Sequence, residues 1–126
     1  MYQALIIDDN SMNIDVLIIL LDREGISYTA IESPRYLNDA LNAVEHFDVV
    51  FLDLEFPNGN GFKLLDELRL DSRLDETPIV AYTVHTSEID VARRAGFDSF
   101  LGKPLDTKKF PAQVQRILRG EQVWET

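Results

Sequence analysis

The stretch Asp48-Val-Val-Phe-Leu-Asp53, followed by Leu54-Glu-Phe-Pro-Asn-Gly-Asn-Gly61, decides the fold of this chain. It is an apolar run of strand length that ends in a carboxylate and enters a loop rich in proline and glycine. The same shape occurs near the N-terminus, where Ala4-Leu-Ile-Ile7 leads directly into Asp8-Asp9. Because the strands of an open parallel sheet end side by side at its ligand-binding edge, the three carboxylates are expected to converge on one pocket.

Apolar runs of strand length alternate with helical patterns along the rest of the chain. Five such units with short connections predict a doubly wound α/β domain, a five-stranded parallel sheet with five helices on its two faces. The expected strands are Ala4–Ile7, Ser27–Ile31, Val49–Leu54, Ile79–Tyr82 and Ser99–Leu101. The expected helices are Ser11–Glu24, Pro34–His46, Phe62–Arg69, Ser87–Ala95 and Pro111–Arg119. Pro111 moves the expected start of the last helix to about Phe110.

Length and composition limit the class of protein. The 126 residues support one domain with its own core, expected over residues 1–120 with a short tail at 121–126. The absence of cysteine excludes disulfides and thiolate metal sites, and it fits a cytoplasmic location. No membrane span or signal peptide is visible in the sequence. A formal net charge of −10 argues against a nucleic-acid partner, since phosphate binding needs a basic surface.

Polar residues stand at the ends of four of the expected strands or just beyond them: Asp8, Asp9, Asp53, Thr83 and Lys103. Taken singly, they have ordinary structural readings, as helix caps, a turn hydroxyl or a solvated loop lysine. Taken together they lie on one sheet edge, where two carboxylates ~4 Å apart repel by ~4 kcal/mol at an effective dielectric of ~20. One lysine does not balance three carboxylates, so the cluster predicts a hard divalent cation such as Mg²⁺.

Beside such a cation, Asp53 can act as a nucleophile toward a phosphoryl group and form an aspartyl phosphate. The ammonium of Lys103 and the hydroxyl of Thr83 would hold the phosphoryl oxygens together with the metal.

The chain resembles the receiver domain of bacterial two-component response regulators, the CheY-like family, over nearly its whole length. The resemblance lies in the order of these motifs and in their placement at the strand ends. The matching pieces are Asp8-Asp9-Asn10, the run from Asp53 to Gly61, Thr83 and Lys103-Pro104. The resemblance implies a flavodoxin-like strand order 2-1-3-4-5. It also implies that Asp53 takes its phosphoryl group from a histidine kinase or a histidine phosphotransfer protein. In the family Mg²⁺ binds the acid matching Asp9 directly, the acid matching Asp8 more often through water, and the backbone carbonyl matching that of Glu55.

The resemblance also implies a switch. Phosphorylation draws the Thr83 hydroxyl inward, and Phe100 turns inward behind it, although Phe100 also fits the reading of a plain core aromatic. The surface of the fourth helix, fifth strand and fifth helix is then repacked and read by a downstream protein in trans. The chain is therefore expected to be a stand-alone receiver that catalyses only its own phosphorylation and dephosphorylation. A chemotaxis role, a phosphorelay role and a weak homodimer all stay open.

Several residues depart from the family pattern. Val84 follows the switch threonine where a small residue is usual, and its branched side chain would narrow access to the pocket. Glu55 and His85 flank the pocket at positions that tune the lifetime of the aspartyl phosphate, with solvated loop side chains as the alternative reading. Phe56 and Asn60 replace the usual Met and Asp of the loop, with little expected effect on the chemistry.

The first helix is apolar nearly all round. Its expected core stripe is Val16, Leu17, Leu20 and Leu21, and further isoleucines at 14, 18 and 19 lie off that stripe. Such a helix is either a docking surface for the phosphodonor or is covered by the chain's own tail, where Val123-Trp124 follows the last helix. Both alternatives stay open.

Two other classes of protein are less consistent with the sequence. In a haloacid dehalogenase the nucleophile ends the first strand and a second aspartate follows two residues later, whereas here the nucleophile is on the third strand and Glu55 takes that second place. A phosphorylation-independent receiver-like interaction module usually lacks the acceptor, an acid or the lysine, and all of these are present here. A nucleotide or flavin site would need a glycine-rich loop after the first strand, which the sequence lacks.

Overall fold

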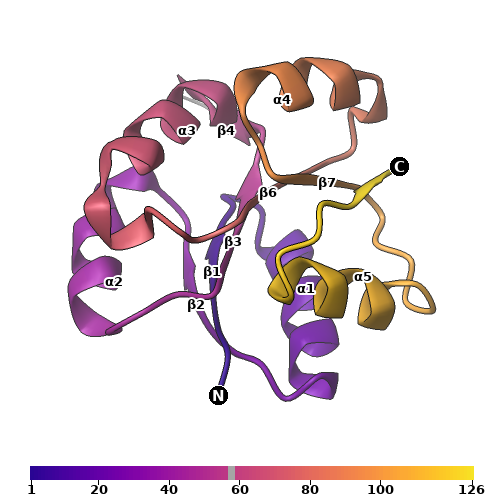
Figure 1. Ribbon diagram of the computed structural model, residues 1–126, viewed down its shortest axis with the longest axis horizontal. Helices are drawn as coiled ribbons and strands as arrows, with labels where there is room; N and C mark the ends of the chain where they lie inside the picture. Colours follow the sequence, from indigo (N-terminus) through magenta and orange to yellow (C-terminus); the bar gives the residue numbers. More distant parts are fainter. Residues whose placement is uncertain (57–58) are drawn as a thin grey trace.

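A parallel sheet forms the centre of the computed structural model, which describes residues 1–56 and 59–126 (Figure 1). Its six strands lie in the order β2-β1-β3-β6-β7-β8. They are β1 (Gln3–Ile7), β2 (Ser27–Ile31), β3 (Val49–Asp53), β6 (Ile79–Thr83), β7 (Ser99–Gly102) and β8 (Trp124–Glu125). The first five confirm the predicted strands and their order, and β8 is an additional short strand at the edge. Two-residue strands β4 (Glu55–Phe56) and β5 (Gly59–Asn60), which were not predicted, pair antiparallel beyond the sheet.

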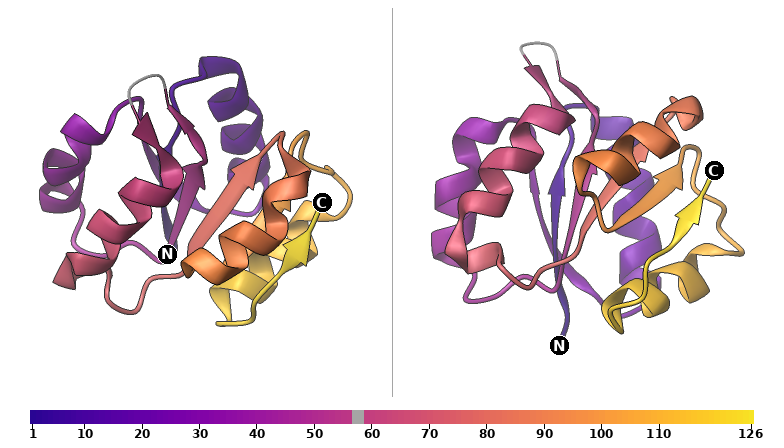
Figure 2. Two further views of the ribbon diagram at one scale, coloured as in Figure 1. Left: turned by 90° about the horizontal axis from the view of Figure 1, so that it is seen from above. Right: turned by 45° about the horizontal axis from the view of Figure 1, so that its top comes forward.

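Helices cover both faces of the sheet, as predicted (Figure 2). Helices α1 (Ser11–Arg23) and α5 (Phe110–Leu118) pack on one face, and α2 (Leu37–Ala43), α3 (Gly61–Leu70) and α4 (Ile89–Ala95) on the other. The helix predicted over Pro34–His46 is shorter, because its first residues form a 3₁₀ turn and the α-helix ends at Ala43. A 3₁₀ turn over Thr86–Glu88 likewise precedes α4. None of the described helices is long and apolar enough to cross a membrane.

Two apolar clusters hold the layers together. Because successive side chains of a strand point to opposite faces, Leu5 and Ile7 of β1 belong to the cluster beneath α2, α3 and α4. Ala4 and Ile6 belong to the cluster beneath α1 and α5. Every residue of β3 and β6 is buried, as expected for central strands covered on both faces. Packing on both faces therefore positions the ends of these strands, where the polar residues stand.

The buried face of α1 differs from the prediction. Leu17, Leu20 and Leu21 are buried as expected, but Ile14 is buried with them while Val16 is 46% exposed. The predicted core-facing stripe is therefore wrong at Val16. The helix is apolar nearly all round, so its sequence does not show which side faces the core. The outer face keeps Val16 exposed, together with Met12 and Ile19.

The C-terminal tail docks on the sheet and leaves the outer face of α1 uncovered. Val123 is 1% exposed and packs in the cluster beneath α1 and α5. Trp124 pairs with Phe100 of β7, and its ring lies 4.6 Å from the guanidinium carbon of Arg93 on α4. The tail therefore extends the sheet from its free edge at β7, which leaves the described outer face of α1 open to solvent.

Candidate functional site

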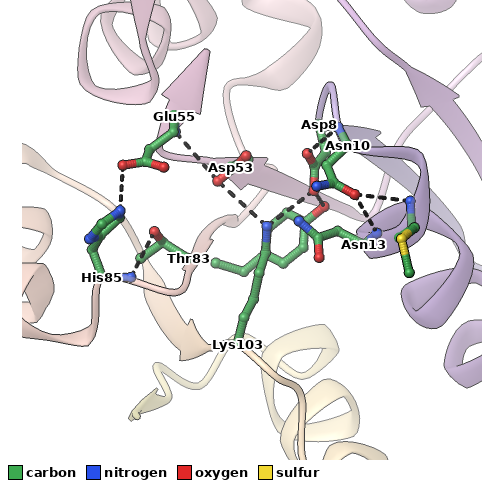
Figure 3. A network of polar contacts seen from close by, with 10 residues as sticks. Asp8, Asn10, Asn13, Asp53, Glu55, Thr83, His85 and Lys103 are labelled. Atoms are coloured by element: carbon green, nitrogen blue, oxygen red, sulfur yellow. Dashed lines mark hydrogen bonds and ion pairs between the residues drawn. The ribbon is translucent and has the colours of Figure 1, made fainter. Parts of the chain in front are cut away.

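Asp53 ends β3 and is almost completely buried, with 6% of its surface exposed. Its Oδ1 lies 3.5 Å from the Nζ of Lys103 and accepts a 3.4 Å hydrogen bond from the backbone N–H of Glu55 (Figure 3). Burial raises the pKa of Asp53 from 3.8 to about 6; Lys103 and the Glu55 N–H oppose this rise, and the charge of Asp8 adds to it. The surroundings of this carboxylate thus disfavour its ionised form.

Asp8, just after β1, is fully buried, and three donors hold its carboxylate. Oδ1 accepts from the backbone N–H of Asn10 at 2.9 Å. Oδ2 accepts from the hydroxyl of Tyr82 at 2.6 Å and from the Nζ of Lys103 at 3.1 Å. Because each carboxylate oxygen accepts about two hydrogen bonds, the remaining capacity of Asp8 is on Oδ1.

The turn after β1 is set by Asn10, which caps α1. Its side-chain oxygen accepts from the backbone N–H groups of Met12 and Asn13, at 3.0 and 3.1 Å. The N-cap of α1 is therefore Asn10. The interpretation of Asp8 and Asp9 as caps of this helix is wrong.

The three carboxylates come together as the sequence predicts. Asp8, Asp9 and Asp53 each offer an oxygen, and these atoms all lie within 4.8 Å of one another. Asp9 is exposed, while the other two are buried. Three carboxylates facing one ammonium leave a negative excess at a site built from hard oxygen donors, which is the donor set that Mg²⁺ prefers. The residues present therefore fit a magnesium ion.

Lys103 follows β7 and lies between the two buried carboxylates. Its side chain is 6% exposed, and its Nζ also lies 4.1 Å from the centre of the Tyr82 ring. Its backbone N–H donates to the carbonyl of Thr83 at 2.9 Å, so the ends of β6 and β7 stay together. The lysine is thus a positioned part of the pocket, as the sequence predicts.

Thr83, the last residue of β6, and Val84, which follows it, differ in burial. Thr83 is 1% exposed, and its Oγ1 accepts from the backbone N–H of His85 at 3.2 Å. Val84 is 58% exposed. The threonine is thus buried at the end of β6, while the valine faces solvent.

Glu55 and His85 meet beside Asp53 and Thr83 (Figure 3). The Nε2 of His85 lies 2.5 Å from the Oε1 of Glu55, and both side chains are about half exposed (Figure 3). The pair joins the loop after β3 to the loop after β6, so these are not separate solvated side chains. Whether they set a phosphate lifetime stays a prediction, as does metal binding by the Glu55 carbonyl.

Phe100 is fully buried in the cluster beneath α2, α3 and α4. Its backbone N–H donates to the carbonyl of Val123 at 2.7 Å, so the tail closes the edge of β7 beside it. The aromatic ring already points inward in this structure, and its role as a switch stays a prediction. Of the loop residues that depart from the family pattern, the side chains of Phe56 and Asn60 lie outside the described part of the structure, as do Pro57 and Asn58.

Tyr82 is the residue that the sequence reasoning missed. It is 1% exposed, and its phenol contacts both Asp8 and Lys103. Burial, and then the nearby carboxylates, raise the pKa of the Tyr82 hydroxyl well above its usual value, so it remains a donor. The one signal in the sequence was a tyrosine inside an otherwise apolar strand, directly before Thr83.

The fold and the site define an α/β domain with an acidic pocket and one lysine at the carboxyl edge of its parallel sheet. The chain belongs to the response regulator receiver domain family, whose model matches residues 4–115. It is 32% identical over 111 residues to stress response regulator protein 1 of Candida tropicalis, covering 83% of this chain and 41% of the relative. It is 30% identical over 125 residues to the transcriptional regulatory protein CpxR of Klebsiella pneumoniae, covering 94% of this chain and 50% of the relative. The chain spans half or less of the length of these relatives.

Solved structures share the fold over nearly their whole length. A two-component response regulator from Clostridium difficile is 28% identical with a TM-score of 0.80, covering 94% of this chain and 97% of the other. The chemotaxis protein CheY4 of Vibrio cholerae is 23% identical with a TM-score of 0.81, covering 93% and 98%. The second likeness shows the fold alone.

Proposed function

We propose that this chain is a phosphorylation-driven switch that accepts a phosphoryl group on Asp53 from a histidine kinase or a histidine phosphotransfer protein. The observation that carries the proposal is the convergence of three carboxylates within 4.8 Å, with Lys103 between the two buried ones. Such an arrangement supplies a nucleophile, a cation site and a positive charge for the phosphoryl oxygens in one pocket.

The proposed step begins with attack by Asp53 on the phosphorus of a phosphohistidine. Oδ2 is the attacking oxygen, because Oδ1 already faces the Lys103 ammonium and the Glu55 N–H. The P–O bond forms, the P–N bond breaks, and its electron pair stays on the imidazole nitrogen of the donor. Lys103 then binds a phosphoryl oxygen, and the Thr83 hydroxyl, which already accepts from the His85 N–H, donates its proton to another.

Asp9, Asp53 and the carbonyl of Glu55 would hold the metal directly. Asp8 would take part through a water on its Oδ1, since its Oδ2 already has two donors. Mg²⁺ bound there would neutralise the carboxylates and the charge of the phosphoryl group during transfer. The chain is thus proposed to catalyse only its own phosphorylation and dephosphorylation.

The output of the proposed switch is a protein surface around α4, β7 and α5, read by a downstream protein partner in trans. A stand-alone role, in chemotaxis or in a phosphorelay, and a cytoplasmic location belong to the proposal. The formal net charge of −10 argues against a nucleic-acid partner.

The test is incubation with acetyl phosphate, or with beryllofluoride, in the presence and absence of Mg²⁺, followed by mass spectrometry of the acetyl phosphate product. We expect a phosphoryl adduct on Asp53 that needs Mg²⁺ and is missing in Asp53→Asn. Asp66→Asn, which changes an exposed aspartate of α3, is the matched control and should still form the adduct. A wild-type chain that forms no adduct and binds no beryllofluoride would instead support a phosphorylation-independent interaction module.

A further inference from the structure

Tyr82 reaches across the sheet to the acidic pocket. It lies on β6 at the register position of Asp53 on β3, and β3 separates its strand from β1. The ring packs edge-on against Phe51 at 6.1 Å, and its hydroxyl donates to Oδ2 of Asp8 at 2.6 Å. One buried side chain therefore links the strand that ends in Thr83 to the acid that follows β1.

The same side chain supports Lys103. The Nζ lies 4.1 Å from the centre of the Tyr82 ring and donates to the Asp8 oxygen that also receives the phenol. Asp8 Oδ2 is thus shared by one neutral donor and one cationic donor, and the cationic donor lies 3.5 Å from Asp53 Oδ1. A phenylalanine at this position would keep the ring under the lysine but would remove the neutral donor.

We propose that Tyr82 is a positioning residue that releases Lys103 from Asp8 for phosphoryl binding at Asp53; this rests on the proposed function. A phosphoryl oxygen on Asp53 draws the ammonium away from Asp8 Oδ2, so the hydrogen bond of the lysine to this fully buried carboxylate is weakened. The Tyr82 hydroxyl keeps that oxygen partnered when the lysine leaves. Without the hydroxyl, Lys103 is the last donor to Oδ2 among the described residues. Movement of the lysine would then leave a buried, charged oxygen without a hydrogen-bond donor.

This role predicts that loss of the Tyr82 hydroxyl weakens binding of the phosphoryl group and leaves the affinity for the metal unchanged. Tyr82→Phe should weaken beryllofluoride binding at saturating Mg²⁺ by about tenfold, the lower end of what a hydrogen bond to a charged group contributes. Affinity for Mg²⁺ alone, measured by calorimetry, should stay within about twofold or tighten, because the phenol contacts Oδ2 and the metal is expected on the Oδ1 side. Tyr28→Phe, at an exposed position of β2, is the matched control and should change neither affinity.

A double-mutant cycle identifies the route of the effect. In a Lys103→Ala background, adding Tyr82→Phe should cause no further loss of beryllofluoride affinity, since the residue acts through the lysine. An equal further loss would show an action independent of Lys103 and overturn the proposal. Parallel losses of Mg²⁺ affinity, beryllofluoride affinity and stability in Tyr82→Phe alone would also overturn it, in favour of a purely structural role.

A measurement on the wild-type chain does not depend on how well a variant folds. In the metal-free protein the Tyr82 hydroxyl proton should exchange slowly with water and be visible by NMR, and rapid exchange would overturn the proposal. If wild-type protein fails to bind beryllofluoride, the proposed function itself is wrong. If wild-type protein binds it and Tyr82→Phe binds it equally well, only the role of Tyr82 is wrong.

Discussion

The substitution Asp53→Asn should stabilise the metal-free protein at neutral pH. Burial and the charge of Asp8 raise the pKa of Asp53 from 3.8 to about 6 despite the opposing effect of Lys103. The folded state therefore binds the Asp53 proton more tightly than the unfolded chain does. The free energy of unfolding of the wild type must then fall as the pH rises from about 4 to above 6, as this carboxylate becomes ionised in the folded state.

The magnitude follows from the size of the shift. A difference of about 2 pKa units at ~1.4 kcal/mol per unit corresponds to roughly 3 kcal/mol of lost stability at pH 7.5. Asparagine has nearly the same shape and carries no charge, so Asp53→Asn should recover most of this amount. Near pH 4 the gain should shrink to below about 1 kcal/mol, because Asp53 is then protonated in the folded wild type.

The assay is urea unfolding of wild type and Asp53→Asn between pH 4 and pH 8, in the presence of a chelator. The quantity of interest is the difference in the free energy of unfolding between the two proteins, because the titration of groups remote from Asp53 affects both alike. Asp66→Asn is the control for loss of an exposed aspartate and should show no such pH-dependent gain. A variant no more stable than wild type at pH 7.5, or a difference that is constant with pH, would refute the reasoning.

Three further predictions follow from the same geometry. Mg²⁺ should raise the melting temperature of the wild type and have a much smaller effect on Asp53→Asn, as thermal unfolding with and without chelator would show. Glu55→Ala and His85→Ala should each shorten the lifetime of the Asp53 phosphate, because loss of the contact between the two side chains lets more water approach Asp53, and the double variant should decay no faster than either; unchanged decay rates would contradict this. Val123→Ala should cost about 1.5 kcal/mol in urea unfolding at ~0.8 kcal/mol per buried methylene, while Val16→Ala, at a 46% exposed position, should cost little.

The sequence sufficed for the sheet because its central strands are fully buried. A strand such as β3 is apolar on both faces, so it appears as a continuous apolar run that ends where the polar edge begins. The same pattern of apolar strands with polar ends explains why the sequence predicts that Asp8, Asp53 and Lys103 share one pocket. Parallel strand ends are neighbours in space once the strand order is given.

Other features depend on information that no local pattern carries. The apolar character of α1 all round left its rotation open, so Val16 was assigned to the core in place of Ile14. Strand β8 is two residues long and depends on pairing with β7, which local propensity cannot reveal. The contact of Tyr82 with Asp8 depends on which face of β6 the ring occupies and on its reach past β3, both of which are tertiary.

Strand β7 pairs with β6 along one edge and with β8 along the other, and of these two strands β6 carries a pocket residue, Thr83. Along one edge it pairs with β6, and the N–H of Lys103 bonds the carbonyl of Thr83, so the two residues expected to bind phosphoryl oxygens share a backbone link. Along the other edge Phe100 pairs with Trp124 of the tail. Because β7 has only four residues, a displacement at its Lys103 end reaches the tail pairing within one or two residues. The tail is therefore linked to Lys103 through the backbone of β7.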